Sequence, residues 1–170
     1  MSRAFVKEGE GEDTEMPERP VSPHPNFVTK RGLALMDREI ESLRKALGVA
    51  HKNADRAEIA RLSRDLRYWA QRRSTVVLVE LEPDAGSVVG FGSKVVIERD
   101  DGKGMSFRIV GEDEADPKAG YVSYVAPIAR ALIGAKTGDI RPVPGGEAEI
   151  IEIDNGVDAE LNADWPGPGT

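Results

Sequence analysis

The chain has 170 residues, of which 39% are hydrophobic and 31% charged, a composition typical of a soluble protein with one modest domain or two small ones. It contains no cysteine and only two histidines, which excludes disulfides, thiolate zinc sites, cysteine nucleophiles and histidine-rich metal centres. No run of about 20 apolar residues could span a membrane, and the first residues are acidic rather than signal-like, so we expect a cytoplasmic protein without a membrane partner.

The net charge of −7 is distributed unevenly along the chain. Residues 27–74 carry twelve basic and six acidic side chains, whereas residues 75–154 carry eight basic and fifteen acidic ones. A basic segment flanked by acidic ones suits a molecule that orients on a large charged partner. Arginine and lysine on the solvated faces of helices would explain the same pattern without a partner, and both interpretations stay open here.

The two ends of the chain lack a pattern that could form a core. Residues 1–26 combine four prolines with several Glu and Gly, and residues 155–170 have a similar composition. Segments of this kind bury too little apolar surface to offset the entropy of ordering them. We expect both to be disordered.

Residues 27–74 predict a pair of helices. Apolar residues recur at alternating intervals of three and four, the spacing of a coiled-coil seam, at Leu33, Met36, Ile40, Leu43 and Leu47 and again at Ile59, Leu62, Leu66 and Trp69. We expect Thr29 to cap the first helix, Gly48 to end it and Asn53 to cap the second. Two arms of about 18 to 20 residues predict an antiparallel helical hairpin about 27 to 30 Å long.

From residue 75 the pattern becomes typical of strands. Short β-rich runs, separated by turn residues, predict five strands at 76–82, 93–99, 105–111, 121–125 and 147–153. Between the last two, a segment that begins at Pro127 and stops at Gly134 predicts one short helix. We therefore expect residues 75–154 to form an α+β domain in which this helix covers one face of an antiparallel sheet.

Several stretches of residues 90–153 closely resemble the C-terminal domain of the GreA/GreB transcript-cleavage and elongation factors. They are FGSKVVIERDD, FRIVGEDEADPKAGYVSYVAPIARALIGAKTGD and GGEAEIIEI, in the order found in that family. The earlier segments VTKRGLALMDREIESL and SRDLRYWAQRR resemble the start of the family's first hairpin helix and the end of its second. The resemblance implies a shortened coiled coil followed by a domain with an FKBP-like fold, which agrees with the elements predicted above.

The resemblance also implies a function. Such factors bind RNA polymerase and act at its secondary channel on backtracked or arrested complexes, so that contact with nascent RNA and DNA is indirect. Two acids at the coiled-coil tip help to hold a magnesium ion of the polymerase, and the polymerase cleaves the RNA. The chain would then be a monomeric auxiliary factor, not an enzyme, with no cofactor of its own.

Two alternatives stay open beside this expectation. One is a non-cleaving regulator that occupies the channel, or competes for it, without delivering magnesium-binding acids. The other is a peptidyl-prolyl isomerase, suggested by the FKBP-like fold. The second is disfavoured because only four Phe, three Tyr and two Trp are available to line a proline pocket.

The tip of the hairpin allows two alignments with the family pattern. One places Val49 and Lys52 where the two acids belong, which removes the acid pair. The other places Asp55 and Glu58 there, but the rest of the tip motif is missing and the hairpin is still about 12 to 18 Å short at 1.5 Å per residue. Asp55 and Glu58 also suit the first turn of a helix, whose dipole favours negative charge.

Three further groups of residues are candidates for interaction. The resemblance implies polymerase contacts at the corner before the short helix, at Tyr124, Val125, Pro127, Ile128 and Arg130. A basic face of the second helix could follow nascent RNA or acidic channel walls through Arg61, Arg64, Arg67, Arg72 and Arg73. The acids Glu112, Asp113, Glu114 and Asp116 lack the spacing of a calcium loop, and we interpret them as a solvated turn.

Overall fold

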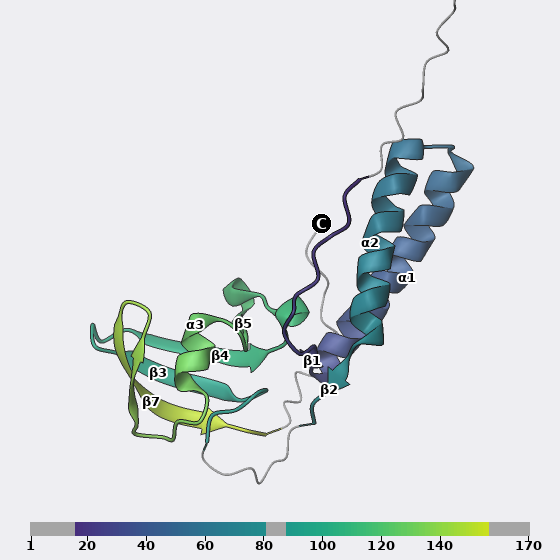
Figure 1. Ribbon diagram of the computed structural model, residues 1–170. Helices are drawn as coiled ribbons and strands as arrows, with labels where there is room; N and C mark the ends of the chain where they lie inside the picture. The colour runs from purple at the N-terminus through teal and green to yellow at the C-terminus, as the bar shows by residue number, and fades with distance from the viewer. Residues whose placement is uncertain (1–15, 81–87, 157–170) are drawn as a thin grey trace, which may run out of the picture.

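A helical hairpin and a curled sheet domain make up the molecule, and the hairpin projects from one end of the sheet (Figure 1). The structure is a computed structural model, and it describes residues 16–80 and 88–156. The architecture is α+β as predicted, with two long helices first and a sheet with one short helix after them. Within the two described ranges, no helix combines the length and apolar character needed to cross a membrane.

Helices α1 (Lys30–Lys52) and α2 (Arg56–Ser74) form the predicted antiparallel hairpin. The apolar seam between them is the one expected from the sequence spacing. Its buried members include Met36, Ile40, Leu43 and Leu62. At 1.5 Å per residue, the 23 residues of α1 and the 19 of α2 span about 34 and 28 Å.

The helix boundaries differ from the prediction near the loop. Thr29 caps α1 as expected, because its hydroxyl accepts a hydrogen bond from the Gly32 N–H at 3.0 Å. Gly48 does not end the helix, and Asn53 follows the end of α1 instead of starting α2. The additional turn buries Ala50 in the seam, and this apolar contact favours continuing the helix past the glycine.

The main sheet has the strand order β5-β4-β3-β7-β6. Its strands are β3 (Lys94–Arg99), β4 (Gly104–Val110), β5 (Tyr121–Ser123), β6 (Ile140–Val143) and β7 (Gly146–Asp154). The sheet is antiparallel except that β5 pairs in parallel with β4. The sequence did not predict β6, because Pro142 interrupts its pattern; an edge strand tolerates this residue.

Two short 3-10 helices connect β4 with β5; the first contains Glu112, Asp113 and Glu114, and Asp116 caps the second. They are η1 (Glu112–Glu114) and η2 (Pro117–Ala119). This connection returns the chain to the start of the next strand, so that β5 runs parallel to β4. The acidic turn therefore lies at the end of the sheet that faces the hairpin (Figure 1).

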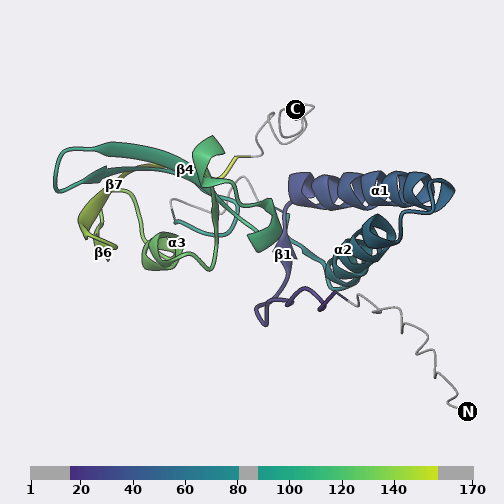
Figure 2. The same cartoon turned by 90° about the horizontal axis from the view of Figure 1, so that it is seen from above.

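Helix α3 (Pro127–Leu132) covers one face of the sheet, as predicted (Figure 2). Pro127 occupies the first helical turn, where its missing N–H costs no hydrogen bond. The core between helix and sheet is apolar. Its most buried members include Val95, Ile97, Ile109, Leu132 and Ile150.

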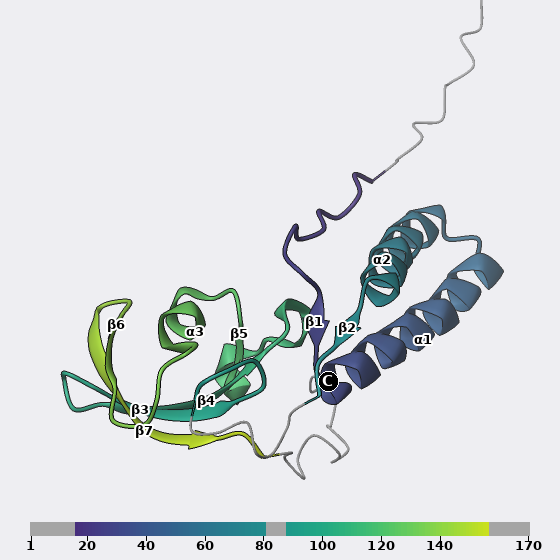
Figure 3. The same ribbon diagram turned by 60° about the horizontal axis from the view of Figure 1, so that its bottom comes forward.

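A second, two-stranded parallel sheet lies at the base of the hairpin (Figure 3). It pairs β1 (Phe27–Val28), which leads into α1, with β2 (Val77–Leu78), which follows α2. The strand predicted at 76–82 is therefore shorter than expected and lies outside the main sheet; its last residues fall outside the described ranges. Together β1 and β2 close the hairpin where it meets the sheet domain.

Residues 16–26, named here the N-terminal strap, contradict the prediction of a disordered segment. They contain no helix or strand but run beside α2 and contact it through Glu18, Arg19 and Asn26 (Figure 1). Residues 1–15, and residues 157–170 of the other predicted disordered segment, lie outside the described ranges.

Candidate functional site

The tip of the hairpin is the loop between α1 and α2, which contains the candidate acids. Asp55 is the N-cap of α2, and its Oδ1 accepts a hydrogen bond from the backbone N–H of Glu58 at 3.1 Å. Ala54 turns the chain into this position with a φ of 53°, in the left-handed region. The expectation that Asn53 is the cap and that Asp55 lies within the first turn is therefore wrong by two residues.

Glu58 belongs to the first turn of α2, where Arg61 holds its carboxylate. The Arg61 Nε donates to Oε2 at 2.9 Å and Nη2 donates to Oε1 at 2.6 Å, so both oxygens face one guanidinium. These hydrogen bonds lower the pKa of the Glu58 carboxyl. Negative charge at this end of the helix also interacts favourably with its dipole.

In this structure both tip acids make hydrogen bonds within the start of α2. Magnesium requires several oxygen ligands at about 2.1 Å, yet Arg61 engages both oxygens of Glu58 and the helix cap uses one oxygen of Asp55. In the alternative alignment Val49 and Lys52 lie exposed in the last turn of α1, and neither side chain offers an oxygen ligand. Across the described part of the chain, no group of three or more potential metal-binding side chains occurs.

The predicted basic face of α2 is partly neutralised by acids of the same chain. Arg61 pairs with Glu58, and Arg64 pairs with Asp65 at 3.0 Å. Two further pairs reach outside the helix. Arg67 pairs with Glu18 of the strap, and Arg73 pairs with Asp37 of α1. The positive charge counted in the sequence is therefore compensated over much of this surface.

Arg72 is not part of an exposed basic face, which corrects the prediction. Its side chain is only 2% exposed and lies between α2, the strap and the acidic turn. Its guanidinium donates to Asp113 and, at 2.8 Å, to Oδ1 of Asn26. The Asn26 amide in turn donates to the Arg72 carbonyl at 2.7 Å. Arg72 therefore holds the hairpin to the sheet domain and cannot reach a nucleic acid.

Tyr68 adds a second link from α2 to the acidic turn. Its hydroxyl donates to Asp113 at 2.8 Å. Burial raises the pKa of the Tyr68 hydroxyl, and the hydrogen bond to the nearby carboxylate acts in the same direction. Asp113 thus accepts from two residues of one helix and fixes its rotation against the sheet domain.

Glu114 shows most clearly that the acidic turn is not solvated. Its side chain is 2% exposed, and it accepts hydrogen bonds from the Arg31 guanidinium at 2.9 Å and the Thr29 hydroxyl at 2.6 Å. Gly32 lies so close that a Cβ there would come within 2.6 Å of Glu114 Oε2. The turn is therefore a buried ionic joint to the start of α1, and the prediction of a solvated turn is wrong.

The sequence contains one signal for this joint. Arg72 follows Trp69 by three residues and so continues the apolar seam of α2, a position where a charge must have a partner. Its partners Asp113 and Asn26 lie 41 positions later and 46 positions earlier in the chain, which spacing alone cannot locate.

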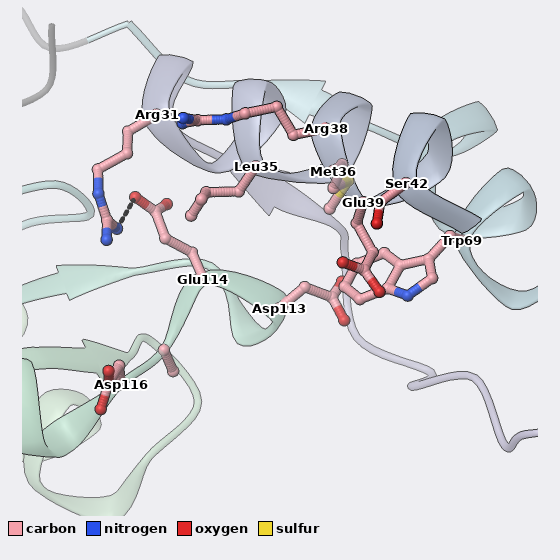
Figure 4. Close-up of a pocket in the computed structure, with 11 residues that line it drawn as sticks. Arg31, Leu35, Met36, Arg38, Glu39, Ser42, Trp69, Asp113, Glu114 and Asp116 are labelled. Atoms are coloured by element: carbon pink, nitrogen blue, oxygen red, sulfur yellow. Dashed lines mark hydrogen bonds and ion pairs between the residues drawn. The ribbon is translucent and has the colours of Figure 1, made fainter. Parts of the chain in front are cut away.

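A cavity of about 490 Å³ opens beside the joint (Figure 4). Leu35, Met36 and Trp69 provide apolar lining, while Arg38 and Glu39 are among its polar side chains. Its volume is that of a small-molecule site. The mixed apolar and charged lining suits the binding of a small molecule.

The candidate polymerase contacts before α3 are not equally accessible. The Tyr124 hydroxyl donates to the Pro25 carbonyl of the strap at 2.6 Å, and its ring packs edge-on against Phe27 and Phe91. Val125 and Ile128 are half-buried. The exposed members of the set are Pro127 and Arg130.

Comparison with known proteins gives the same family over both parts of the chain. Residues 83–155 match the family model described as "Transcription elongation factor, GreA/GreB, C-term". The transcription elongation factor GreB of Yersinia pestis is 31% identical over 150 residues, covering 75% of this chain and 88% of the relative. The chain belongs to the GreA/GreB family of transcription elongation factors.

Other family members show similar identity. GreB of Pseudomonas putida is 32% identical, and the match covers 72% of this chain and 88% of the relative. GreA of Ralstonia nicotianae is 33% identical, and the match covers 72% of this chain and 91% of the relative. Among solved structures, the GreA factor homolog Gfh1 of Thermus thermophilus has 24% identity and a TM-score of 0.36 over 76% of this chain and 99% of its own. A GreA/GreB factor from Nitrosomonas europaea has 22% identity and the same TM-score, and the match covers 75% of this chain and 98% of that protein.

Proposed function

We propose that this GreA/GreB family member binds RNA polymerase and acts at its secondary channel on backtracked or arrested complexes. The observation that carries the proposal is the shape of the hairpin: two helices project from a family-type sheet domain (Figure 1). A narrow projection of this kind suits insertion into a channel. The chain would act as a monomer in the cytoplasm, and its binding to the polymerase would bring it to RNA and DNA.

The joint at the base of the hairpin supports insertion, because it makes the projection rigid. Buried pairs between Arg72 and Asp113 and between Arg31 and Glu114 connect both helices to the acidic turn. A hairpin that pivoted freely would lose orientational entropy on entering a channel, whereas a fixed one has already lost it. Polymerase contact by the sheet domain would then set where the tip lies.

The exposed side chains before and within α3 are the proposed docking residues. Pro127 and Arg130 are exposed, Val125 and Ile128 are half-buried, and Ile128 packs against the core. Tyr124 would act indirectly by holding the strap and the aromatic ring pairs in place.

One observation favours the non-cleaving form of this function. Glu58 is bound by Arg61 and Asp55 caps α2, so the tip presents a completed helix start instead of two free carboxylates. The family resemblance also implies a hairpin too short to reach the polymerase magnesium. The factor would then occupy the channel, and any RNA cleavage would remain the work of the polymerase with its own magnesium.

Transcript cleavage in backtracked elongation complexes tests the two forms. The complexes are incubated with magnesium and the full chain, with a cleavage-competent GreB relative as the positive control. We expect no shortened 3′ RNA from this chain and slower cleavage when it is added together with GreB. Shortening that disappears in Asp55→Ala or Glu58→Ala would show instead that the tip delivers a metal.

A further inference from the structure

The two halves of the N-terminal strap are held very differently. The half nearest α1 is anchored: Asn26 is 5% exposed and bonded to Arg72, and the Pro25 carbonyl accepts the Tyr124 hydroxyl. The half around Glu18 and Arg19 lies on the surface of α2 (Figure 1). Its outer end can therefore leave the helix while the anchor stays in place.

The outer half makes an ion pair and a ring contact with α2, and both lie at the protein surface. The Glu18 carboxylate accepts from Nε of Arg67 at 2.8 Å, and these side chains are 61% and 57% exposed. The Arg19 guanidinium lies 3.8 Å from the ring centre of Tyr68 and 5.9 Å from that of Trp69, and it approaches Asp65 at 3.6 Å. Exposed ion pairs of this kind are weak and screened by salt.

These two contacts reproduce the chemistry of a nucleotide on a protein surface. An anionic carboxylate lies on an arginine, as a phosphate would, and a planar guanidinium lies on an aromatic ring, as a base would. An acidic peptide would match only the first contact. Single-stranded RNA offers both groups at neighbouring positions, and this surface therefore fits RNA better than a peptide whose charged side chains are all acidic.

We propose that the strap is an intramolecular competitor of single-stranded RNA for the α2 surface formed by Arg67 and Tyr68. The proposal rests on the proposed function, which brings this helix next to nascent RNA. RNA binding displaces Glu18 and Arg19, while Asn26 keeps the base of the strap in place.

Fluorescence anisotropy with a labelled 12-nucleotide single-stranded RNA tests the competition in the full chain. The strap variant is Glu18→Lys with Arg19→Ala. The control is Glu41→Lys with Lys45→Ala, which makes the same net charge change in an exposed ion pair of α1. We expect the strap variant to bind RNA at least about fivefold more tightly than wild type and the control to stay within about twofold. Adding Arg67→Gln to the strap variant should remove the gain.

Three results would overturn the proposal. The first is an equal increase in RNA affinity in the strap variant and the control, and the second is no increase in the strap variant. The third is an increase that persists when Arg67→Gln is added. Preferential tightening toward a polyglutamate peptide would also contradict it, in favour of an acidic protein partner. Binding to RNA polymerase is measured on the same variants. If the variants bind polymerase but the strap variant does not bind RNA more tightly, only the role of the strap as a competitor is rejected. If the strap variant binds RNA more tightly but the protein does not bind polymerase, only the proposed function is rejected.

Discussion

The carboxylate of Glu114 and the guanidinium of Arg31 form an ion pair of 2.9 Å in which the side chains are 2% and 5% exposed. The pair connects the turn after β4 with the first turn of α1, across 83 positions of sequence. The Thr29 hydroxyl that caps α1 donates to the same carboxylate at 2.6 Å. The cap of α1 and one of the two buried ion pairs that attach the hairpin to the sheet domain therefore share the Glu114 carboxylate.

Removing one member of this pair should destabilise the protein strongly. Arg31→Met leaves a buried carboxylate without its cation, and the expected loss in the free energy of unfolding is about 3 to 5 kcal/mol. Lys45→Met, in the exposed pair with Glu41, should cost less than about 1 kcal/mol. Urea unfolding of both variants makes the comparison, and equal losses would contradict a buried joint.

Alanine should have opposite effects at two glycines of α1. At Gly32 a Cβ would come within 2.6 Å of Glu114 Oε2 and 3.0 Å of Val28, so Gly32→Ala should lower the melting temperature. At Gly48 nothing lies within 4 Å, and Gly48→Ala should stabilise the helix by about 0.5 to 1 kcal/mol. Thermal unfolding followed by circular dichroism distinguishes them. Stabilisation by both variants would show that the joint has more room than the structure gives it.

The capping role of Asp55 predicts which substitutions are tolerated. Asp55→Ala removes the acceptor for the Glu58 N–H and should cost about 0.5 to 2 kcal/mol of unfolding free energy. Asp55→Ser restores a capping oxygen without the charge and should recover most of that loss. The measurement is denaturant unfolding. If serine is as damaging as alanine, the role of Asp55 is electrostatic and not that of a cap.

The pKa of Glu58 should depend on Arg61. Since the folded-state pKa lies below the ordinary value of 4.5, the charged pair stabilises the fold above that pH and loses its effect as the pH falls through the folded value. Carboxyl ¹³C NMR should show the Glu58 pKa rising toward the ordinary value in Arg61→Gln. Arg67→Gln, which removes a neighbouring cation of α2 that pairs with Glu18 instead, should leave it unchanged. An equal rise in both variants would mean that overall charge, not the pair, sets this pKa.

Periodicity predicted the elements whose residues lie close together in sequence. The seam from Met36 to Leu43 and its counterpart at Leu62 predict the helical hairpin. Alternating apolar residues predict the strands, and Pro127 predicts the start of the short helix. The errors at Gly48 and Asn53 arose because glycine and asparagine are local signals, whereas burial of Ala50 depends on the opposite helix.

The joint could not be predicted in the same way because its partners are distant in sequence. Asp113 and Glu114 appear in the sequence as part of a polar turn, and only the path of the chain through η1 places them against Arg72 and Arg31. The strap shows the same limit. Its proline-rich composition indicates disorder, yet Asn26 is buried and exchanges hydrogen bonds with Arg72 once α2 has folded.

Competition with GreB for RNA polymerase shows whether this chain binds at the secondary channel. Fluorescently labelled GreB is bound to core polymerase, and the unlabelled full chain is added while the anisotropy of the label is followed. If the chain binds at the secondary channel, it should displace labelled GreB, and Arg130→Glu should weaken the displacement. Full retention of GreB at a saturating concentration of the chain would contradict binding at that site.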